Sequence, residues 1–169
     1  MSEQTVSTEI VSIDDAQGGS KLGSQIVAIA KNNAPFYSSI KGNDLATKVK
    51  TLAAMNNAKP VSENLNKTIR LTDLIIQQVE LNQRDQNGNI ISDPATGEVK
   101  TDIAPRVVLI DESGEAFVST SMGMFGACQQ LLGVAGEPHL WGEAIEIHVV
   151  EAGVKPRKYY TIQYGPASK

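Results

Sequence analysis

The C-terminal part of the chain contains five separate stretches rich in apolar and β-branched residues, several of which alternate with polar positions. This alternation is typical of strands that bury one face in a sheet. The stretches are Thr68–Leu81, Arg106–Ile110, Ala116–Thr120, Ala144–Glu151 and Lys158–Tyr164, and a segment with helical spacing, Met122–Leu132, separates the third from the fourth. The pattern therefore predicts three strands, a helix and two further strands.

The first predicted strand alternates imperfectly. Ile69 and Val79 share a parity with the polar residues Asp73 and Gln77, whereas Leu74 has the other parity. A long strand that bends or bulges to serve both sides of a barrel shows such a pattern. We therefore expect an irregularity within this strand.

The predicted helix has clear signals at both ends. Ser121 is placed to cap its N-terminus, and Gly133 is expected to end it. Two internal glycines, Gly123 and Gly126, lower its intrinsic helicity by roughly 1 kcal/mol each. They predict that the backbone of the helix packs closely against a neighbouring element.

A second helix is predicted before the strands, over Asp44–Met55, with Asn43 or Asp44 as its cap. Its apolar residues form a single stripe, and its two lysines lie off that stripe. The stripe consists of Leu45, Val49, Leu52 and Ala53, and the lysines are Lys48 and Lys50.

Turn residues and composition divide the chain into four parts. Residues 1–24 are polar and are expected to form a flexible arm, with one added strand proposed at Val6–Ile13. The other parts are a helical extension (25–60), the main domain (61–165) and a tail (166–169). Residues 82–105 are turn-rich and are expected to form a loop between the first two strands.

The order of three strands, a helix and two strands is that of an OB-fold, a five-stranded, partly open barrel. The predicted fold is thus mainly β with helices: an OB-fold whose helix lies between strands three and four, with an N-terminal helical extension. Such barrels often hold single-stranded nucleic acid.

Composition supports an intracellular globular protein. Hydrophobic residues make up 41% of the 169 residues and charged residues 20%, which is ordinary for a globular chain. No apolar run reaches the roughly 18–20 residues of a membrane helix, and the polar N-terminus does not resemble a signal peptide. With a single cysteine, Cys128, no internal disulfide forms. We therefore expect a cytoplasmic location and no membrane association.

The net charge of −4 conceals two basic regions. Residues 41–70 hold six cations and two acids, and residues 152–169 hold four cations and no acid. A local basic surface binds phosphates even when the total charge is negative. The alternative is that these lysines are ordinary solvated side chains.

The sequence predicts no catalytic site, no metal site and no cofactor. Cys128, His139 and His148 lack the spacing of metal ligands, and both histidines are expected at the surface. Cys128 lies among apolar residues and is expected to be a buried small side chain rather than a nucleophile. An enzyme is therefore not expected.

The connection between the last two strands is the most suggestive local motif. Three cations, Lys155, Arg157 and Lys158, precede the adjacent tyrosines Tyr159 and Tyr160. Single-strand binding combines cations for phosphates with aromatic rings for bases. Tyr160 shares its parity with apolar strand residues and is expected in the core. Tyr159 is then expected to stack on a base, the alternative being an exposed aromatic that packs across the strands.

Four further residues complete the predicted site. Phe117, on the third strand, either stacks on a base or belongs to the core. Arg106 opens the second strand and is expected to meet a phosphate. Lys48 and Lys50 are expected to extend the basic track.

Three segments resemble the OB-fold single-stranded DNA-binding proteins encoded by bacteriophages and plasmids. They are Arg106-Val107-Val108-Leu109-Ile110, the segment from Gly114 to Ser121, and the closing Lys158–Tyr164. The resemblance covers roughly residues 60–165. It implies non-sequence-specific coating of single-stranded DNA during replication or DNA transfer, without chemistry, in the host cytoplasm. RNA is an alternative ligand, and the acidic tail of cellular relatives is lacking.

Two further interpretations remain. The acidic centre of the chain and its 5% aromatic content favour an OB-type protein–protein interaction module or structural adaptor that binds no nucleic acid. The polar, glycine-punctuated N-terminal arm also suggests self-association between neighbouring protomers.

Overall fold

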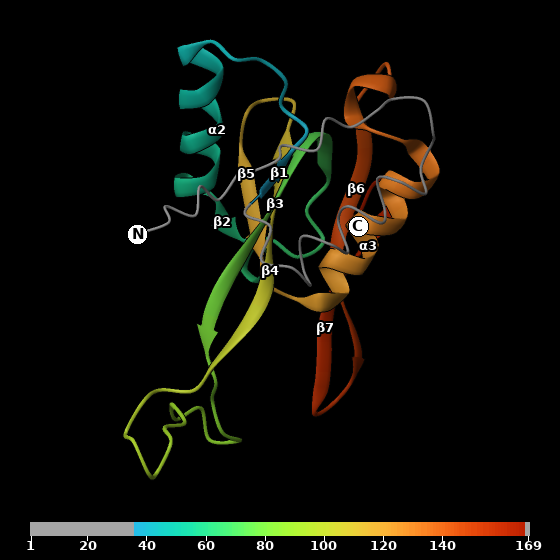
Figure 1. The fold of residues 1–169 in the computed structure, drawn as a ribbon. Coiled ribbons are helices and arrows are strands. Elements are labelled where there is room, and N and C mark those ends of the chain that lie inside the picture. Colours follow the sequence, from blue (N-terminus) through green and yellow to red (C-terminus); the bar gives the residue numbers. More distant parts are fainter. Residues whose placement is uncertain (1–35, 168–169) are drawn as a thin grey trace, which may run out of the picture.

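The computed structural model describes residues 36–167, which form a mainly β structure with a curled open sheet and two helices (Figure 1). The elements are β1 (Phe36–Ser38), α2 (Leu45–Asn57), β2 (Lys59–Pro60), η1 (Val61–Glu63), β3 (Ile69–Asn82), β4 (Thr101–Asp111), β5 (Ala116–Ser119), α3 (Met122–Ala135), η2 (Pro138–Leu140), β6 (Ile145–Val154) and β7 (Arg157–Tyr164). The five predicted strands and both predicted helices occur in the predicted order. The expected arm at residues 1–24, with its proposed strand, lies outside the described residues.

The sheet has the strand order β2-β5-β4-β3-β6-β7, and β1 pairs with β3. All pairs are antiparallel except β2–β5. The sheet curls into a half-barrel, but β5 and β7 do not pair along its open side. The N-terminus of α3 lies at this seam, where the Ser121 hydroxyl accepts a hydrogen bond from the Tyr160 backbone N–H at 3.4 Å. The same hydroxyl caps α3, as the sequence predicted, by accepting from the N–H groups of Gly123 and Met124.

β3 is the central strand, and it contains the predicted irregularity. It pairs with β4 along its length, and the register shifts between Leu71 and Asp73. On its other edge, Ile69–Leu71 pairs with β6 and Ile75–Gln77 pairs with β1. The bulge therefore marks the point at which β3 changes its second partner.

Apolar side chains are buried on both faces of the two central strands. Leu74 and Ile76 belong to the larger core between the sheet and α3, whereas Ile75 belongs to a smaller core with Ala54 of α2. All three β3 residues have no exposed surface. Burial on both faces explains why the alternation along this strand is imperfect.

Several predicted boundaries were wrong; β6, for example, ends at Val154 rather than at Glu151. β4 begins at Thr101 rather than Arg106 and includes Pro105, which pairs with Gln78. Pro105 is tolerated because β5 pairs only with Val107–Ile110, so that β4 is an edge strand at the proline. α3 continues through Gly133 to Ala135 and ends at Gly136, which has a φ of +74°.

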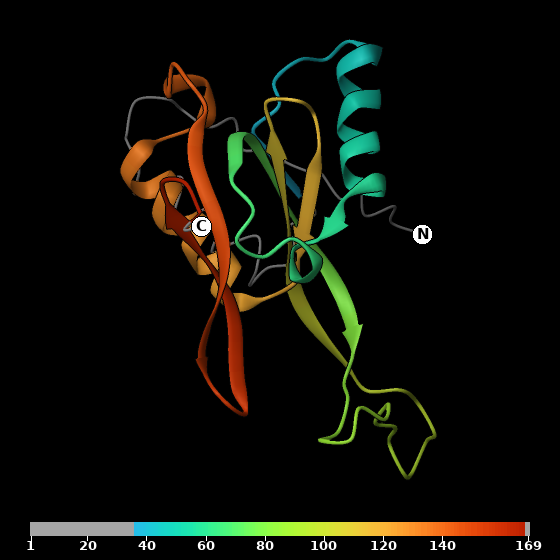
Figure 2. The same ribbon diagram turned by 180° about the vertical axis from the view of Figure 1, so that it is seen from behind.

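The β3–β4 hairpin extends well beyond the sheet, and we call residues 80–103 the β3–β4 arm (Figures 1 and 2). Its stem is the ladder between Glu80–Asn82 and Thr101–Ile103. Beyond the stem, isolated bridges join Arg84 to Ile90 and Ser92 to Val99. The predicted loop is therefore a strand extension followed by a hydrogen-bonded loop.

α2 lies over the outer face of the sheet and is capped by Asp44, whose carboxylate accepts from the Thr47 N–H at 2.9 Å. Ala54 is its one buried residue. Of the predicted stripe, Leu45, Val49 and Leu52 are 53–77% exposed, and Ala53 is exposed as well, so the stripe does not pack on the sheet. Among the described residues, no helix is both long and apolar enough to cross a membrane.

Candidate nucleic-acid interface

The β6–β7 hairpin carries the predicted cluster of cations and tyrosines. Its ladder runs from Ile147–Tyr164 to Val154–Arg157 and places Lys155 and Pro156 in the tip. Lys155 and Arg157 are exposed. Lys158 pairs with Glu151 of the opposite strand, so its charge is locally balanced. The hairpin therefore offers two cations that make no ion pair with another described residue.

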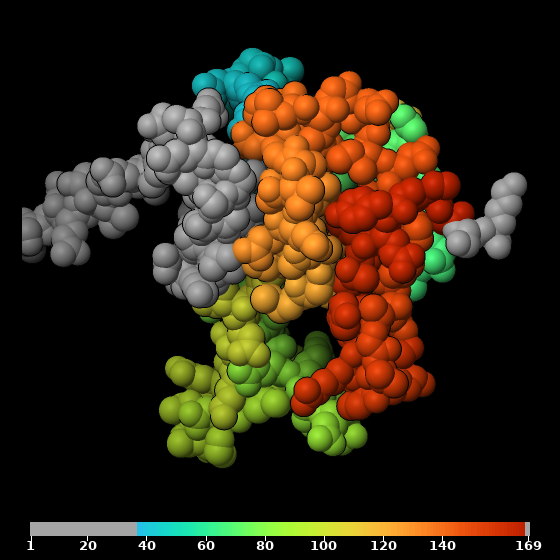
Figure 3. All heavy atoms as spheres, turned by 90° about the vertical axis from the view of Figure 1, so that its right-hand side faces the viewer, coloured from blue at the N-terminus to red at the C-terminus, as the bar shows by residue number. Residues whose placement is uncertain are grey.

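Figure 3 shows the hairpin and the β3–β4 arm as two projections from the same end of the molecule, with a hollow between them below α3. The two projections differ in charge. The arm contains five acids and two cations, whereas the hairpin tip contains only cations. A strand of phosphates is therefore attracted by the hairpin side of the hollow and repelled by the arm side.

Tyr159 is held by two glycines. A β-carbon at Gly123 would lie 2.4 Å from Tyr159 Cδ2, and one at Gly153 would lie 3.2 Å from Tyr159 Cδ1. The ring thus rests on backbone from α3 and from β6, and 47% of the residue remains exposed. An aromatic ring that is both supported and solvent-accessible is suited to stacking at little entropic cost.

The predicted division of the two tyrosines is confirmed: Tyr160 packs against the larger core, and Tyr159 is exposed. The predicted close packing of α3 is confirmed at Gly123. It is wrong at Gly126, where a β-carbon would meet no atom within 4 Å. Sequence reasoning missed Gly153, because a glycine beside a hairpin tip is also what an ordinary turn requires.

Phe117 belongs to the core, which corrects its predicted stacking role. The ring has no exposed surface, and Phe117 pairs across to Leu109 of β4, another fully buried residue. Lys67 covers the ring, with Nζ 5.0 Å from its centroid. The core alternative is therefore the one that the structure supports.

Arg106 fixes α2, which corrects its predicted role as a phosphate ligand. Its Nη2 donates to the Met55 carbonyl at 2.7 Å, and its Nη1 donates to Gln77 Oε1 at 3.2 Å. Met55 lies in the last turn of α2, where carbonyl groups lack intrahelical partners. The guanidinium therefore joins the end of the helix to the sheet.

Lys48 and Lys50 are exposed on α2, which lies at the opposite end of the molecule from the β6–β7 tip (Figure 1). The structure does not bring them to the hairpin, so they do not extend its basic track. Their separation comes from the placement of α2 on the outer face of the sheet, which the local sequence did not reveal.

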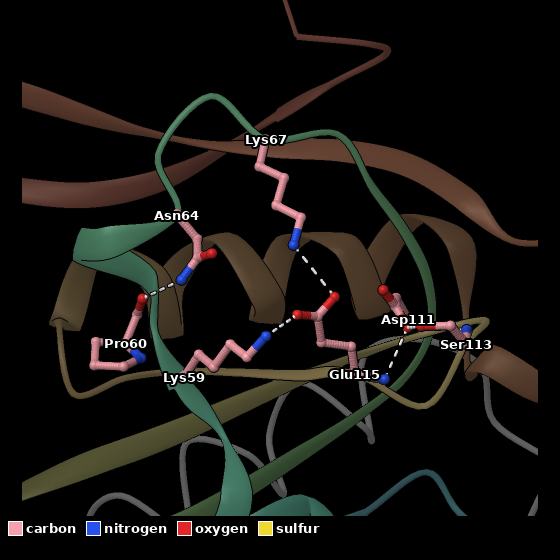
Figure 4. Close-up of polar contacts among 7 residues, drawn as sticks. All are labelled: Lys59, Pro60, Asn64, Lys67, Asp111, Ser113 and Glu115. Carbon is pink, nitrogen blue, oxygen red and sulfur yellow. Dashed lines mark hydrogen bonds and ion pairs between the residues drawn. The ribbon is translucent and has the colours of Figure 1, made fainter.

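Most of the basic region at residues 41–70 is neutralised by acids from elsewhere in the fold. Figure 4 shows Lys59 and Lys67 converging on Glu115, which Asp111 positions by accepting from its N–H. The two ammonium groups lower the pKa of the Glu115 carboxyl. Two further cations also form ion pairs, Lys41 with Glu137 and Arg70 with Glu112 and Glu146. The region is therefore much less basic in the fold than in the sequence.

Within residues 36–167, no group of three His, Cys, Asp or Glu side chains is placed to hold a metal ion. Burial raises the pKa of the Cys128 thiol to about 12, which leaves it protonated and unreactive at neutral pH. His148 was predicted at the surface but is buried, with its ring nitrogens 3.0 Å from the Gly165 carbonyl and 3.2 Å from Gln163 Oε1. Residues 163–165 cover the outer face of β6 at this point.

Comparisons of the chain with protein-family models, curated proteins and solved structures find no match.

The two α3 glycines provide a matched test of the Tyr159 support. Gly123→Ala should lower the free energy of unfolding by about 1–3 kcal/mol, because its β-carbon meets the Tyr159 ring and the Tyr160 carbonyl. Gly126→Ala should raise it by up to about 1 kcal/mol, because alanine favours the helix and meets open space. Urea denaturation measures both, and a Gly123→Ala protein as stable as Gly126→Ala would refute the contact.

The Glu115 cluster predicts an acid-dependent contribution to stability. Because the folded pKa of Glu115 is lowered below its ordinary value of 4.5, its contribution is present above that pH and is lost as the pH falls through the folded pKa. The stability difference between the wild type and Glu115→Gln should therefore shrink in acid below about pH 4.5. Glu63→Gln, an exposed acid without an ion pair to a described residue, should show no such convergence in urea titrations at each pH.

Proposed function

We propose that this protein binds single-stranded nucleic acid without sequence preference, through the β6–β7 hairpin of an OB-fold. The fold assignment is supported by the pairing of five strands. β3 pairs with β4 and β6, β4 with β5, and β6 with β7, and α3 lies between β5 and β6 in the chain. This is the connectivity of an OB barrel that is left open between its third and fifth strands.

The observation that carries the proposal is the position of Tyr159 next to unpaired cations. The ring rests on Gly123 and Gly153 and is half exposed, while Lys155 and Arg157 lie at the tip of the same hairpin. An exposed aromatic ring leaves apolar surface in contact with water, which is unfavourable unless a partner covers the ring. A nucleobase presents a flat apolar face of similar size and can cover it. The nearby cations suit the phosphates on either side of such a base.

The ligand class follows from these groups. A stacking ring and two cations contact features that every nucleotide shares, so they favour binding without readout of base edges. The acidic β3–β4 arm repels the phosphates of a bound strand. We therefore place the proposed path of the strand along the β6–β7 hairpin and not across the arm. The proposed role in DNA replication or transfer comes from the resemblance to phage and plasmid proteins; the hairpin itself suits DNA and RNA alike.

A second function, protein–protein interaction, is favoured by a different observation. The apolar stripe of α2 is exposed rather than packed on the sheet. Exposed apolar patches of this kind mark interaction surfaces. This surface is at the other end of the molecule from the hairpin, so that the two functions are compatible.

Tyr159→Ala should weaken the binding of a short labelled oligo-dT by about 1–3 kcal/mol, because one stacking contact is lost. The matched control is Tyr164→Ala, which removes a tyrosine of similar exposure from the far end of β7. Fluorescence anisotropy at low salt measures both affinities. Equal affinities of the two variants would remove Tyr159 from the site, and no binding by the wild type would reject the proposed function.

If Lys155 and Arg157 contact phosphates, the affinity for single-stranded DNA should fall as the salt concentration rises. Each phosphate contact on a single strand contributes about 0.7 to the slope of log K against log salt. Replacing Lys155 and Arg157 together by Gln should therefore reduce the slope by about 1.4. Lys48→Gln with Lys50→Gln removes the same charge from α2 and should leave the slope for a short oligonucleotide unchanged; an equal reduction would place the phosphates elsewhere.

A further inference from the structure

Two surfaces at opposite ends of the molecule have complementary properties. The first, which we call the α2 face, consists of the exposed aliphatic residues Leu45, Val49 and Leu52, and the exposed Lys48 and Lys50 flank this stripe on its two sides. α2 itself contains no acid. The α2 face is therefore apolar and positively charged.

The second surface is the β3–β4 arm, which is apolar and negatively charged. Four of its aliphatic side chains are 38–49% exposed: Leu81, Ile90, Val99 and Ile103. Its five acids are Glu80, Asp85, Asp93, Glu98 and Asp102, against the cations Arg84 and Lys100, which gives a net charge of −3. Each face of the stem carries one acid next to one aliphatic side chain, because residues directly opposite each other share a face. Glu80 is opposite Ile103, and Asp102 is opposite Leu81.

Most of the charges on these two surfaces lack an ion-pair partner within the described residues. Within residues 36–167, ion pairs engage Lys41, Lys59, Lys67, Arg70 and Lys158. Over the same residues, neither lysine of α2 and none of the five arm carboxylates takes part in an ion pair. Asp85, Asp93 and Asp102 accept only neutral hydrogen bonds, which order the arm and leave its charge in place.

The placement of the two surfaces excludes contact within one molecule. Figures 1 and 2 show α2 at one end of the sheet and the arm projecting from the other. A contact between surfaces that differ and lie at opposite ends is head-to-tail, and repeated head-to-tail contacts build a ring where the rotation between copies closes and an open chain where it does not.

We propose that the β3–β4 arm of one copy docks on the α2 face of the next copy. Aliphatic side chains meet at the centre, and the arm carboxylates face Lys48 and Lys50. Both surfaces are small, so the contact is weak for free protein and is strengthened when neighbouring copies share one strand. The contact itself does not require nucleic acid; its use in cooperative coating rests on the proposed function.

Cross-linking of the full chain tests this contact directly. The native Cys128 is fully buried, so that cysteines introduced at exposed positions are the accessible thiols. A protein with both Val49→Cys and Val99→Cys should form a ladder of oligomers with a flexible bismaleimide. Either single variant alone should stay monomeric, and a mixture of the two should give dimers. Val134→Cys, an exposed valine on α3, should replace Val49→Cys without forming a ladder.

Reversing the charges of the two surfaces distinguishes a specific contact from cross-linking by random collision. Lys48→Glu with Lys50→Glu should reduce the Val49→Cys/Val99→Cys cross-link about tenfold, because like charges then face each other. Mixing this Val49→Cys protein with a Val99→Cys protein that carries Asp93→Lys and Glu98→Lys should restore it. A variant that merely perturbs folding would not be rescued by a compensating change in its partner.

Several results would overturn the proposal. Dimers of the Val49→Cys variant alone would indicate a symmetric contact between two α2 faces. Protection of that thiol from a monofunctional maleimide would show that another part of the chain already covers the face. The absence of a ladder would exclude the contact. A ladder without oligo-dT binding would count against the proposed function alone, because the cross-link is measured without nucleic acid.

Discussion

The structure depends on the double pairing of β3. This strand pairs with β4 along its length and divides its other edge between β6 and β1, with a bulge at the transition. The bulge lets a single strand follow the curl of the sheet while its side chains are buried on both faces. Without it, a continuous register would turn Leu74 and Ile76 away from the larger core and Ile75 away from the smaller one.

The position of the two projections follows from this central strand. The β3–β4 arm is the continuation of β3 beyond the body of the sheet. The β6–β7 hairpin is attached through the pairing of β6 with the other half of β3. Because α3 lies at the open seam between β5 and β7, its N-terminus meets the hairpin and supports Tyr159 through Gly123. The proposed stacking ring is thus positioned by regular elements rather than by a free loop.

The charge balance of the protein also depends on which segments the fold brings together. The cations near Glu115, Glu112 and Glu146 are balanced by acids that lie far away in the sequence. The charges that remain unbalanced are concentrated on α2, on the hairpin tip and on the arm. Such charges influence association more than stability, since exposed charges contribute little to the folding free energy. The proposed binding of nucleic acid and the proposed contact between copies both use these unbalanced charges.

The sequence by itself determined the element order, the helix caps, the irregular first strand and the exposure of Tyr159 relative to Tyr160. These depend on neighbours within a few residues, on capping chemistry or on strand parity. Only the tertiary structure decided that Phe117 is core, that Arg106 fixes the end of α2, and that Lys48 and Lys50 lie away from the hairpin. It also decided that β4 continues through Pro105 and that α3 passes Gly133. Each of these depends on which distant segment lies alongside a residue, and local pattern carries no information about that partner.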